Sequence, residues 1–136
     1  MAQLDSHVSN SSLWAGRIIG GLSVLFLLFD GAMKLVKPAF VVDATVNLGY
    51  DENTIIPLGV VLIVCTILYL IPATSVLGAI LLTGYLGGAV ATHVRASQGL
   101  FSIIFPVIIG ILLWLSLYLL DVRLRALIPF RSRRYS

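Results

Sequence analysis

A few ionisable and polar residues stand out because they interrupt long apolar stretches of the sequence. Asp30 and Lys34 lie four residues apart near the end of the first stretch. Thr92, His93 and Arg95 lie together at the end of the third. An acidic residue four positions before a lysine favours an ion pair on a helix. Histidine can act as a general acid or base, and ionisable groups inside a membrane span indicate a functional site by default.

Two interpretations of these five residues follow from their spacing. Asp30 can pair with Lys34 on its own helix, or with His93 or Arg95 across the fold. In one interpretation the residues form a structural network of ion pairs that joins the first and third stretches. In the other they form the polar wall of a pocket for a small molecule or a lipid head group. The spacing alone does not decide between them.

Other motifs that carry chemistry are missing from the sequence. Cys65 is the only cysteine, so no disulfide within the chain is expected. His7 lies in a polar segment and cannot join His93 in an intramembrane haem site. The sequence has no cluster of ligands with metal-site spacing, no glycine-rich phosphate loop and no GxSxG motif. We therefore expect no metal and no intrinsic cofactor.

The composition places these residues in a membrane. Of the 136 residues, 59% are hydrophobic and 11% are charged, and the mean hydropathy is +1.04. Soluble domains have about 45–50% apolar and about 25% charged residues. A chain this short cannot bury such an apolar excess in one small core. The composition excludes a soluble globular enzyme, a disordered tail and a nucleic-acid-binding module, even though the pI is about 9.4.

Four apolar stretches are long enough to cross the bilayer, which takes about 20 residues as a helix. Continuous apolar runs favour helices over barrel strands, which alternate with period two. The predicted fold is an all-α integral membrane protein, a bundle of four transmembrane helices. It has a polar tail (1–13), a four-helix domain (14–120) and a basic tail (121–136). The four spans are 14–36, 55–71, 74–94 and 100–120.

The segment between the first two spans mixes apolar and polar residues. It is predicted to be either a short amphipathic helix at the membrane interface or an ordinary loop. Pro106 lies inside the fourth span and is expected to kink that helix unless the helix starts later.

The distribution of basic residues predicts the orientation. Five of the nine basic residues follow the last span, and the positive-inside rule places such a segment in the cytoplasm. An even number of spans then places both termini in the cytoplasm and the polar residues around Asp30 near the outer face. Contact between the basic tail and membrane lipid is also expected. The five residues are Arg123, Arg125, Arg131, Arg133 and Arg134.

Small residues predict close helix packing. They recur at four-residue spacing in the first and third spans, and such patterns let helix backbones approach closely in membranes. The third span has so many of them that we expect it at the centre of the bundle. The predicted packing residues are Gly16, Gly20, Ala79, Thr83, Gly84, Gly87, Gly88 and Ala91.

Several segments resemble the DoxX-like family of small bacterial membrane proteins. They are residues 29–35 (FDGAMKL), 48–50 (LGY), 69–72 (YLIP) and, most specifically, 77–95, and the resemblance covers about 14–120. It implies a four-helix bundle in the bacterial inner membrane, linked to quinone-dependent redox systems. It also implies a bound quinone or lipid, and other membrane subunits or further copies of the chain as partners. Ala73 departs from the family pattern, in which a basic residue often follows the Ile-Pro turn.

Three functions remain as hypotheses. The first is an accessory or binding subunit of a quinone-linked membrane redox complex. The second is an enzyme that acts on a lipid or quinone-like substrate, with His93 as general acid or base, Asp30 orienting it and Arg95 holding an anionic group. The third is a small transporter with proton coupling at Asp30, which the neighbouring Lys34 disfavours. Whether the protein is an enzyme stays open at this point.

Overall fold

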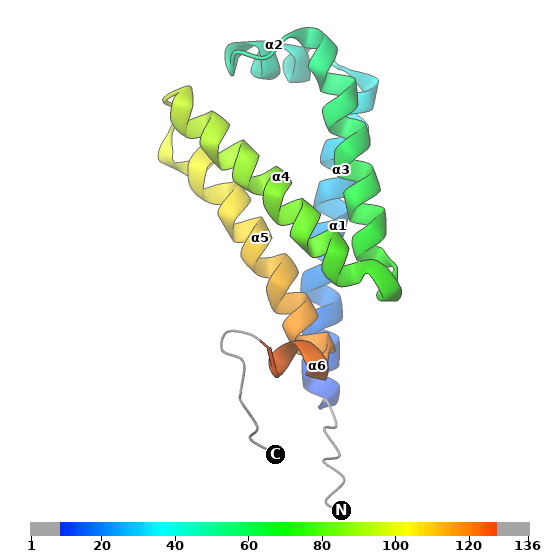
Figure 1. Cartoon of the computed structure of the whole chain (residues 1–136). Coiled ribbons are helices and arrows are strands. Elements are labelled where there is room, and N and C mark those ends of the chain that lie inside the picture. The colour runs from blue at the N-terminus through cyan, green and yellow to red at the C-terminus, as the bar shows by residue number, and fades with distance from the viewer. Residues whose placement is uncertain (1–8, 128–136) are drawn as a thin grey trace, which may run out of the picture.

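Four long helices dominate the computed structural model, which describes residues 9–127 (Figure 1). All four are long and apolar enough to cross a membrane. They lie within a few residues of the four predicted spans, so the prediction of an all-α, multi-pass four-helix bundle is confirmed. The long helices are α1 (Asn10–Val36), α3 (Ile55–Leu70), α4 (Ser75–Arg95) and α5 (Leu100–Leu120).

Shorter helices occupy the connections and the end of the chain. The segment between α1 and α3 contains α2 (Ala39–Asn47), which is followed by the 3-10 turn η1 (Glu52–Thr54). Of the two structures predicted for this segment, a short helix or a loop, the helix is observed. A second 3-10 turn, η2 (Pro72–Thr74), joins α3 to α4, and α6 (Val122–Arg125) follows α5. The helix α5 continues through Pro106, so the proline does not end it.

The first helix begins earlier than the predicted span. Ser9 is its N-cap, and the Ser9 side chain accepts a hydrogen bond of 3.2 Å from the Ser12 amide. Residues 10–13, assigned to the polar tail from the sequence, therefore form the first turn of α1. The remainder of that tail (1–8, with His7) and the end of the basic tail (128–136, with three of its arginines) lie outside the described residues.

The four long helices form a ring in which each packs against two others. The helix α1 contacts α3 and α5, and α4 contacts the same two helices on the opposite side of the ring. The expectation that the third span lies at the centre of the bundle is therefore wrong. Its small residues are spread around the helix and do not all face other helices, as the individual glycines show.

The glycine contacts between α1 and α5 lie near the start of α1. A Cβ atom on Gly16 would lie 2.8 Å from Cγ of Leu120, and one on Gly20 would lie 3.2 Å from Cβ of Ser116. The Ser116 hydroxyl donates a hydrogen bond of 2.7 Å to the carbonyl oxygen of Gly16. Backbone and side chain therefore approach closely here because the two glycines have no side chain of their own.

The contact between α3 and α4 is equally close at the same end of the bundle. Gly78 in the first turn of α4 packs on the backbone of Tyr69, and a Cβ atom there would lie 2.8 Å from the carbonyl carbon of Leu68. The buried Tyr69 hydroxyl donates a hydrogen bond of 2.7 Å to the carbonyl oxygen of Leu113 in α5. This end of the bundle is thus held by contacts among all four helices.

At the other end, where α2 lies, the helices separate into two pairs. The helices α4 and α5 lean away from α1 and α3 toward α2 (Figure 1). The pair α1 and α3 stays in contact through two glycines that face each other, since a Cβ atom on Gly59 would lie 3.1 Å from the carbonyl oxygen of Gly31. The angle between the two pairs leaves space inside the bundle, and that space contains the polar residues.

Candidate functional site

A cavity of about 390 Å³ lies between the two helix pairs, next to α2, and we call it the α2-side cavity. Its walls come from all four long helices, from α2 and from the segment that follows α2. Apolar side chains line it toward the middle of the bundle, and polar side chains line it toward α2. The apolar lining includes Phe26, Leu27, Leu86, Phe105 and Ile109.

Four of the five polar residues predicted from the sequence line this cavity. Asp30 and Lys34 form an ion pair on α1, with the Lys34 side chain largely shielded and Asp30 more exposed. Thr92 and His93 line the opposite side, on α4. The ion pair lies within α1, so a network of ion pairs that joins α1 to α4 is not observed among the described residues, whereas the pair does form part of a pocket wall.

Arg95, the fifth residue, does not line the cavity. Its guanidinium group donates a hydrogen bond of 2.6 Å to the carbonyl oxygen of Leu48, in the segment after α2. Neither Arg95 nor His93 forms an ion pair with Asp30 among the described residues. Arg95 therefore attaches the segment after α2 to the end of α4, beside the cavity.

His93 has unused hydrogen-bonding capacity. Its Nδ1 atom is buried and has no hydrogen-bond partner within residues 9–127. Buried polar side-chain atoms in folded proteins nearly always have a partner. An imidazole nitrogen can accept a hydrogen bond or, when protonated, donate one. A molecule in the cavity that presents a hydroxyl or carbonyl oxygen would provide the missing partner.

The helix α2 and the segment after it close one side of the cavity, and that segment is attached to the end of α4. Thr45, Leu48 and Tyr50 all contribute to the lining. The Tyr50 hydroxyl and Thr92 Oγ1 share a hydrogen bond of 2.7 Å, which adds to the contact from Arg95. We call residues 39–50 the cover of the cavity. The sequence motif LGY marked part of the cover, but it gave no indication that this motif reaches α4.

Gly49 in the cover has a backbone conformation that favours glycine. Its φ angle is +89°, and a Cβ atom would lie 2.9 Å from a terminal nitrogen of Arg95. A residue with a side chain would be strained at this φ and would also displace the guanidinium group. The glycine therefore allows Arg95 to reach the carbonyl group next to it.

Replacing Arg95 by alanine is expected to loosen the cover while the bundle stays folded. The variant loses the hydrogen bond to Leu48, and amide hydrogen exchange in residues 39–50 should become several-fold faster, since local opening costs less free energy. Exchange in α1 and α5 should not change. Arg123→Ala is the control, because Arg123 is exposed on α6 at the other end. Unchanged exchange in the cover of Arg95→Ala would show that Arg95 does not hold it.

Two glycines of α4 leave space in the α2-side cavity. Gly84 and Gly88 line it, and a Cβ atom on either would meet nothing within 4 Å among the described residues. Gly87 is equally open but faces a different depression. These three glycines were expected to pack against other helices, and within the described chain they do not. They face the open space of the cavity and of the groove instead.

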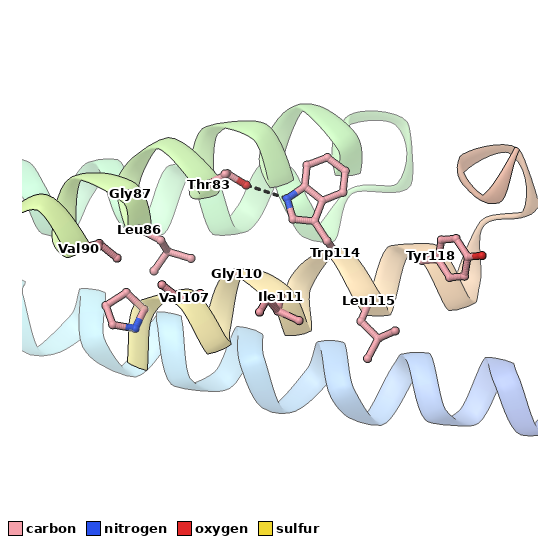
Figure 2. A pocket seen from close by; sticks show the side chains of 11 residues that line it. Thr83, Leu86, Gly87, Val90, Val107, Gly110, Ile111, Trp114, Leu115 and Tyr118 are labelled. Atoms are coloured by element: carbon pink, nitrogen blue, oxygen red, sulfur yellow. Dashed lines mark hydrogen bonds between the residues drawn. The ribbon is translucent and has the colours of Figure 1, made fainter. Parts of the chain in front are cut away.

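A second depression, the outer groove, lies between α4 and α5 (Figure 2). It has a volume of about 530 Å³ and an almost wholly apolar lining that includes Gly87 and Gly110. The Trp114 indole donates a hydrogen bond of 2.8 Å to Thr83 Oγ1 across the groove, as the dashed line in Figure 2 shows. The groove contains no ionisable side chain apart from a tyrosine, so hydrogen-bonding chemistry concentrates in the α2-side cavity.

Two contacts that the enzyme hypothesis requires are not observed among the described residues. Within residues 9–127 no hydrogen bond links His93 to Asp30, so the histidine lacks the orienting partner that the enzyme hypothesis gave it. The Arg95 guanidinium is engaged by the cover. In the same part of the chain, no three His, Cys, Asp or Glu side chains gather where they could hold a metal ion.

Comparison with known proteins gives one match. The family model described as the DoxX-like family matches residues 18–116, which include most of α1, all of α2 to α4 and most of α5. The match contains every residue of the α2-side cavity. Neither the curated proteins nor the solved structures contain a match.

Proposed function

The chain belongs to the DoxX-like family, and from this premise we propose that it is a membrane-embedded binding subunit that holds a quinone or a lipid in the α2-side cavity. The cavity itself is the observation that carries the proposal. Its volume of about 390 Å³ falls within the range of about 300–1,000 Å³ typical of small-molecule sites. Such sites are mostly apolar with a few placed polar groups, and this cavity has the same composition.

The two ends of the cavity suit the two ends of an amphiphile. The aromatic and aliphatic side chains toward the middle of the bundle can contact a ring or an acyl chain. The polar groups next to α2 can bind head-group oxygens, and His93 Nδ1 has no competing partner among the described residues. An amphiphile can reach these groups from the membrane with its polar end directed toward the interface.

We further propose an accessory role in a quinone-linked redox complex of the bacterial inner membrane. The family resemblance supports this role, and the basic residues after α5 support an orientation with both termini in the cytoplasm. In that orientation the α2-side cavity opens near the outer face of the membrane. Other subunits of the complex, or further copies of this chain, would then exchange the bound molecule with the site.

The test fills the cavity without disturbing the bundle. The protein is purified from its membrane in mild detergent, and the small molecules it retains are extracted and quantified by mass spectrometry. Gly84→Leu places a side chain into the cavity, where a Cβ atom meets nothing within 4 Å. We expect at least a tenfold loss of one retained quinone or lipid species, because the added side chain occupies its volume.

The matched control for this experiment is Gly21→Leu. Gly21 is also exposed on a long helix and has nothing within 4 Å of a Cβ position, but it lines neither the cavity nor the groove. This variant should retain the molecule at the level of the unmodified protein. The proposal fails if no species is retained above the detergent background, or if Gly84→Leu retains as much as Gly21→Leu.

The enzyme and transporter hypotheses receive less support from the geometry. The enzyme hypothesis needs an oriented His93, whereas Asp30 is paired with Lys34 instead. The transporter hypothesis relies on Asp30 as its coupling group, and Asp30 is instead held in the ion pair with Lys34. The binding function requires neither and is the one we adopt.

A further inference from the structure

The acidic and basic side chains that line the α2-side cavity are engaged with each other. Asp30 and Lys34 form an ion pair, and these are the only acidic and basic side chains in the lining, His93 apart. Lys37, at the end of α1, pairs with Glu52 at 3.2 Å. The remaining polar side chains of the lining are hydroxyl groups and the imidazole. The wall of the cavity therefore carries opposite charges that compensate each other.

We infer that the α2-side cavity selects an uncharged head group bearing a hydroxyl or carbonyl oxygen, which His93 binds through Nδ1, and that Asp30 determines this selectivity by neutralising Lys34. The inference rests on the proposed function and names the chemical class of its ligand. It assigns separate roles to the two sides of the cavity. The side on α4 provides the hydrogen bond, and the side on α1 excludes charged head groups.

A charged head group would bind less favourably because it would disrupt the ion pair between Asp30 and Lys34. An anionic group could pair with the largely shielded Lys34 only in competition with Asp30, which would lose its charge partner. A cationic group would compete with Lys34 in the same way. A neutral oxygen leaves the pair intact and satisfies the buried nitrogen of His93.

The hydroxyl groups near His93 are already engaged. Tyr50 and Thr92 share a hydrogen bond, and Thr92 also donates a hydrogen bond of 2.8 Å to the carbonyl oxygen of Gly88. Among the buried side-chain nitrogen and oxygen atoms of the described residues, His93 Nδ1 is the one that has no hydrogen-bond partner. Because this nitrogen is buried, the imidazole ring turns toward the cavity when a head group binds it.

The experiment measures which head group the site prefers. Three amphiphiles with the same oleyl chain length are used as probes: a neutral monoacylglycerol, the anionic lysophosphatidate and the cationic oleylamine. Each competes with a fluorescent neutral monoacylglycerol for the purified full-length protein in uncharged detergent micelles. The unmodified protein should bind the monoacylglycerol about tenfold more tightly than either charged probe, which corresponds to about 1.4 kcal/mol.

Charge-changing variants should shift this preference in opposite directions. Asp30→Asn leaves Lys34 uncompensated and should improve lysophosphatidate binding relative to monoacylglycerol by about tenfold. Lys34→Met should shift the preference toward oleylamine by a similar factor. The double variant Asp30→Asn/Lys34→Met removes both charges and should bind the neutral probe again in preference to the others, which also shows that the altered bundle is folded.

His93→Leu separates the hydrogen bond from the charge selectivity. It should weaken monoacylglycerol binding several-fold, since a neutral hydrogen bond contributes about 0.5–1.5 kcal/mol, while the order of the three probes stays the same. His93→Gln keeps a donor and an acceptor and should restore much of the affinity. Unchanged affinity in His93→Leu would contradict the role of Nδ1.

The outcomes distinguish this inference from the proposed function. Binding in the cavity is the binding that Gly84→Leu abolishes. If no probe shows such binding to the unmodified protein, both the proposed binding function and this inference fail. If the probes bind in the cavity but a charged one is preferred, or if Asp30→Asn leaves the preference unchanged, the inference alone is overturned.

Discussion

Gly78→Ala should destabilise the bundle by about 3 kcal/mol, the upper end of the range for inserting a methyl group into a packed contact. The added Cβ atom would lie 2.5 Å from Cα of Tyr69 and 2.8 Å from the carbonyl carbon of Leu68. These are backbone atoms of α3, so no side-chain rotation can relieve the overlap. The helices α3 and α4 would have to separate at the turn that joins them.

Unfolding in mixed micelles, with increasing amounts of a denaturing detergent, measures this effect. Gly87→Ala is the matched control, because it lies on the same helix and a Cβ atom there meets nothing within 4 Å. The control should be as stable as the unmodified protein or more stable by up to about 1 kcal/mol, the difference in helix propensity between alanine and glycine. Equal stability of the two variants would show that the close approach at Gly78 does not support the fold.

Arg125→Met should lower the free energy of unfolding by about 2–4 kcal/mol, because hydrogen bonds from a charged group contribute about 1.5–3 kcal/mol and several are lost together. The Arg125 guanidinium group donates to the carbonyl oxygens of Tyr118 at 2.7 Å and Leu119 at 2.8 Å, at the end of α5. It also donates at 2.7 Å to the Ser12 hydroxyl in the first turn of α1.

Methionine keeps much of the side-chain length of Arg125 but provides none of these donors. The carbonyl groups at the end of α5 have no following helical turn to bind them, so the arginine supplies what the helix lacks there. The control is Arg123→Met on the same short helix, whose side chain is exposed. The same unfolding measurement should give a change of less than about 0.5 kcal/mol for this control. A similar loss in both variants would indicate a general effect of charge near the membrane surface.

The helices could be predicted from the sequence, and so could one contact of the site. Hydropathy locates membrane spans because lipid requires about 20 consecutive apolar residues. The Asp30–Lys34 pair follows from helical geometry, which brings residues four apart onto one face. Both inferences depend only on residues that are close in the sequence.

The rest of the site depends on how distant segments meet. The partner of Arg95 is the carbonyl oxygen of Leu48, a backbone group that any residue would provide, so no residue type signals the contact. The small residues of the third span gave a further wrong expectation. Gly20 and Gly88 occur in the same kind of four-residue pattern, yet Gly20 contacts α5 and Gly88 faces a cavity. The directions in which the helices run determine whether a given glycine packs against a neighbouring helix or faces a cavity.

The separation of the helices into two pairs toward α2 has a consequence for how this protein can change over evolutionary time. The contacts of Gly16, Gly20 and Gly78 lie at the end away from α2, and none of these residues lines the α2-side cavity. Under the proposed function, substitutions at Gly84, Gly88 or His93 would therefore alter the ligand with little loss of folding stability. A bundle built in this way can acquire new ligand preferences by single substitutions, while the opposite end preserves the scaffold.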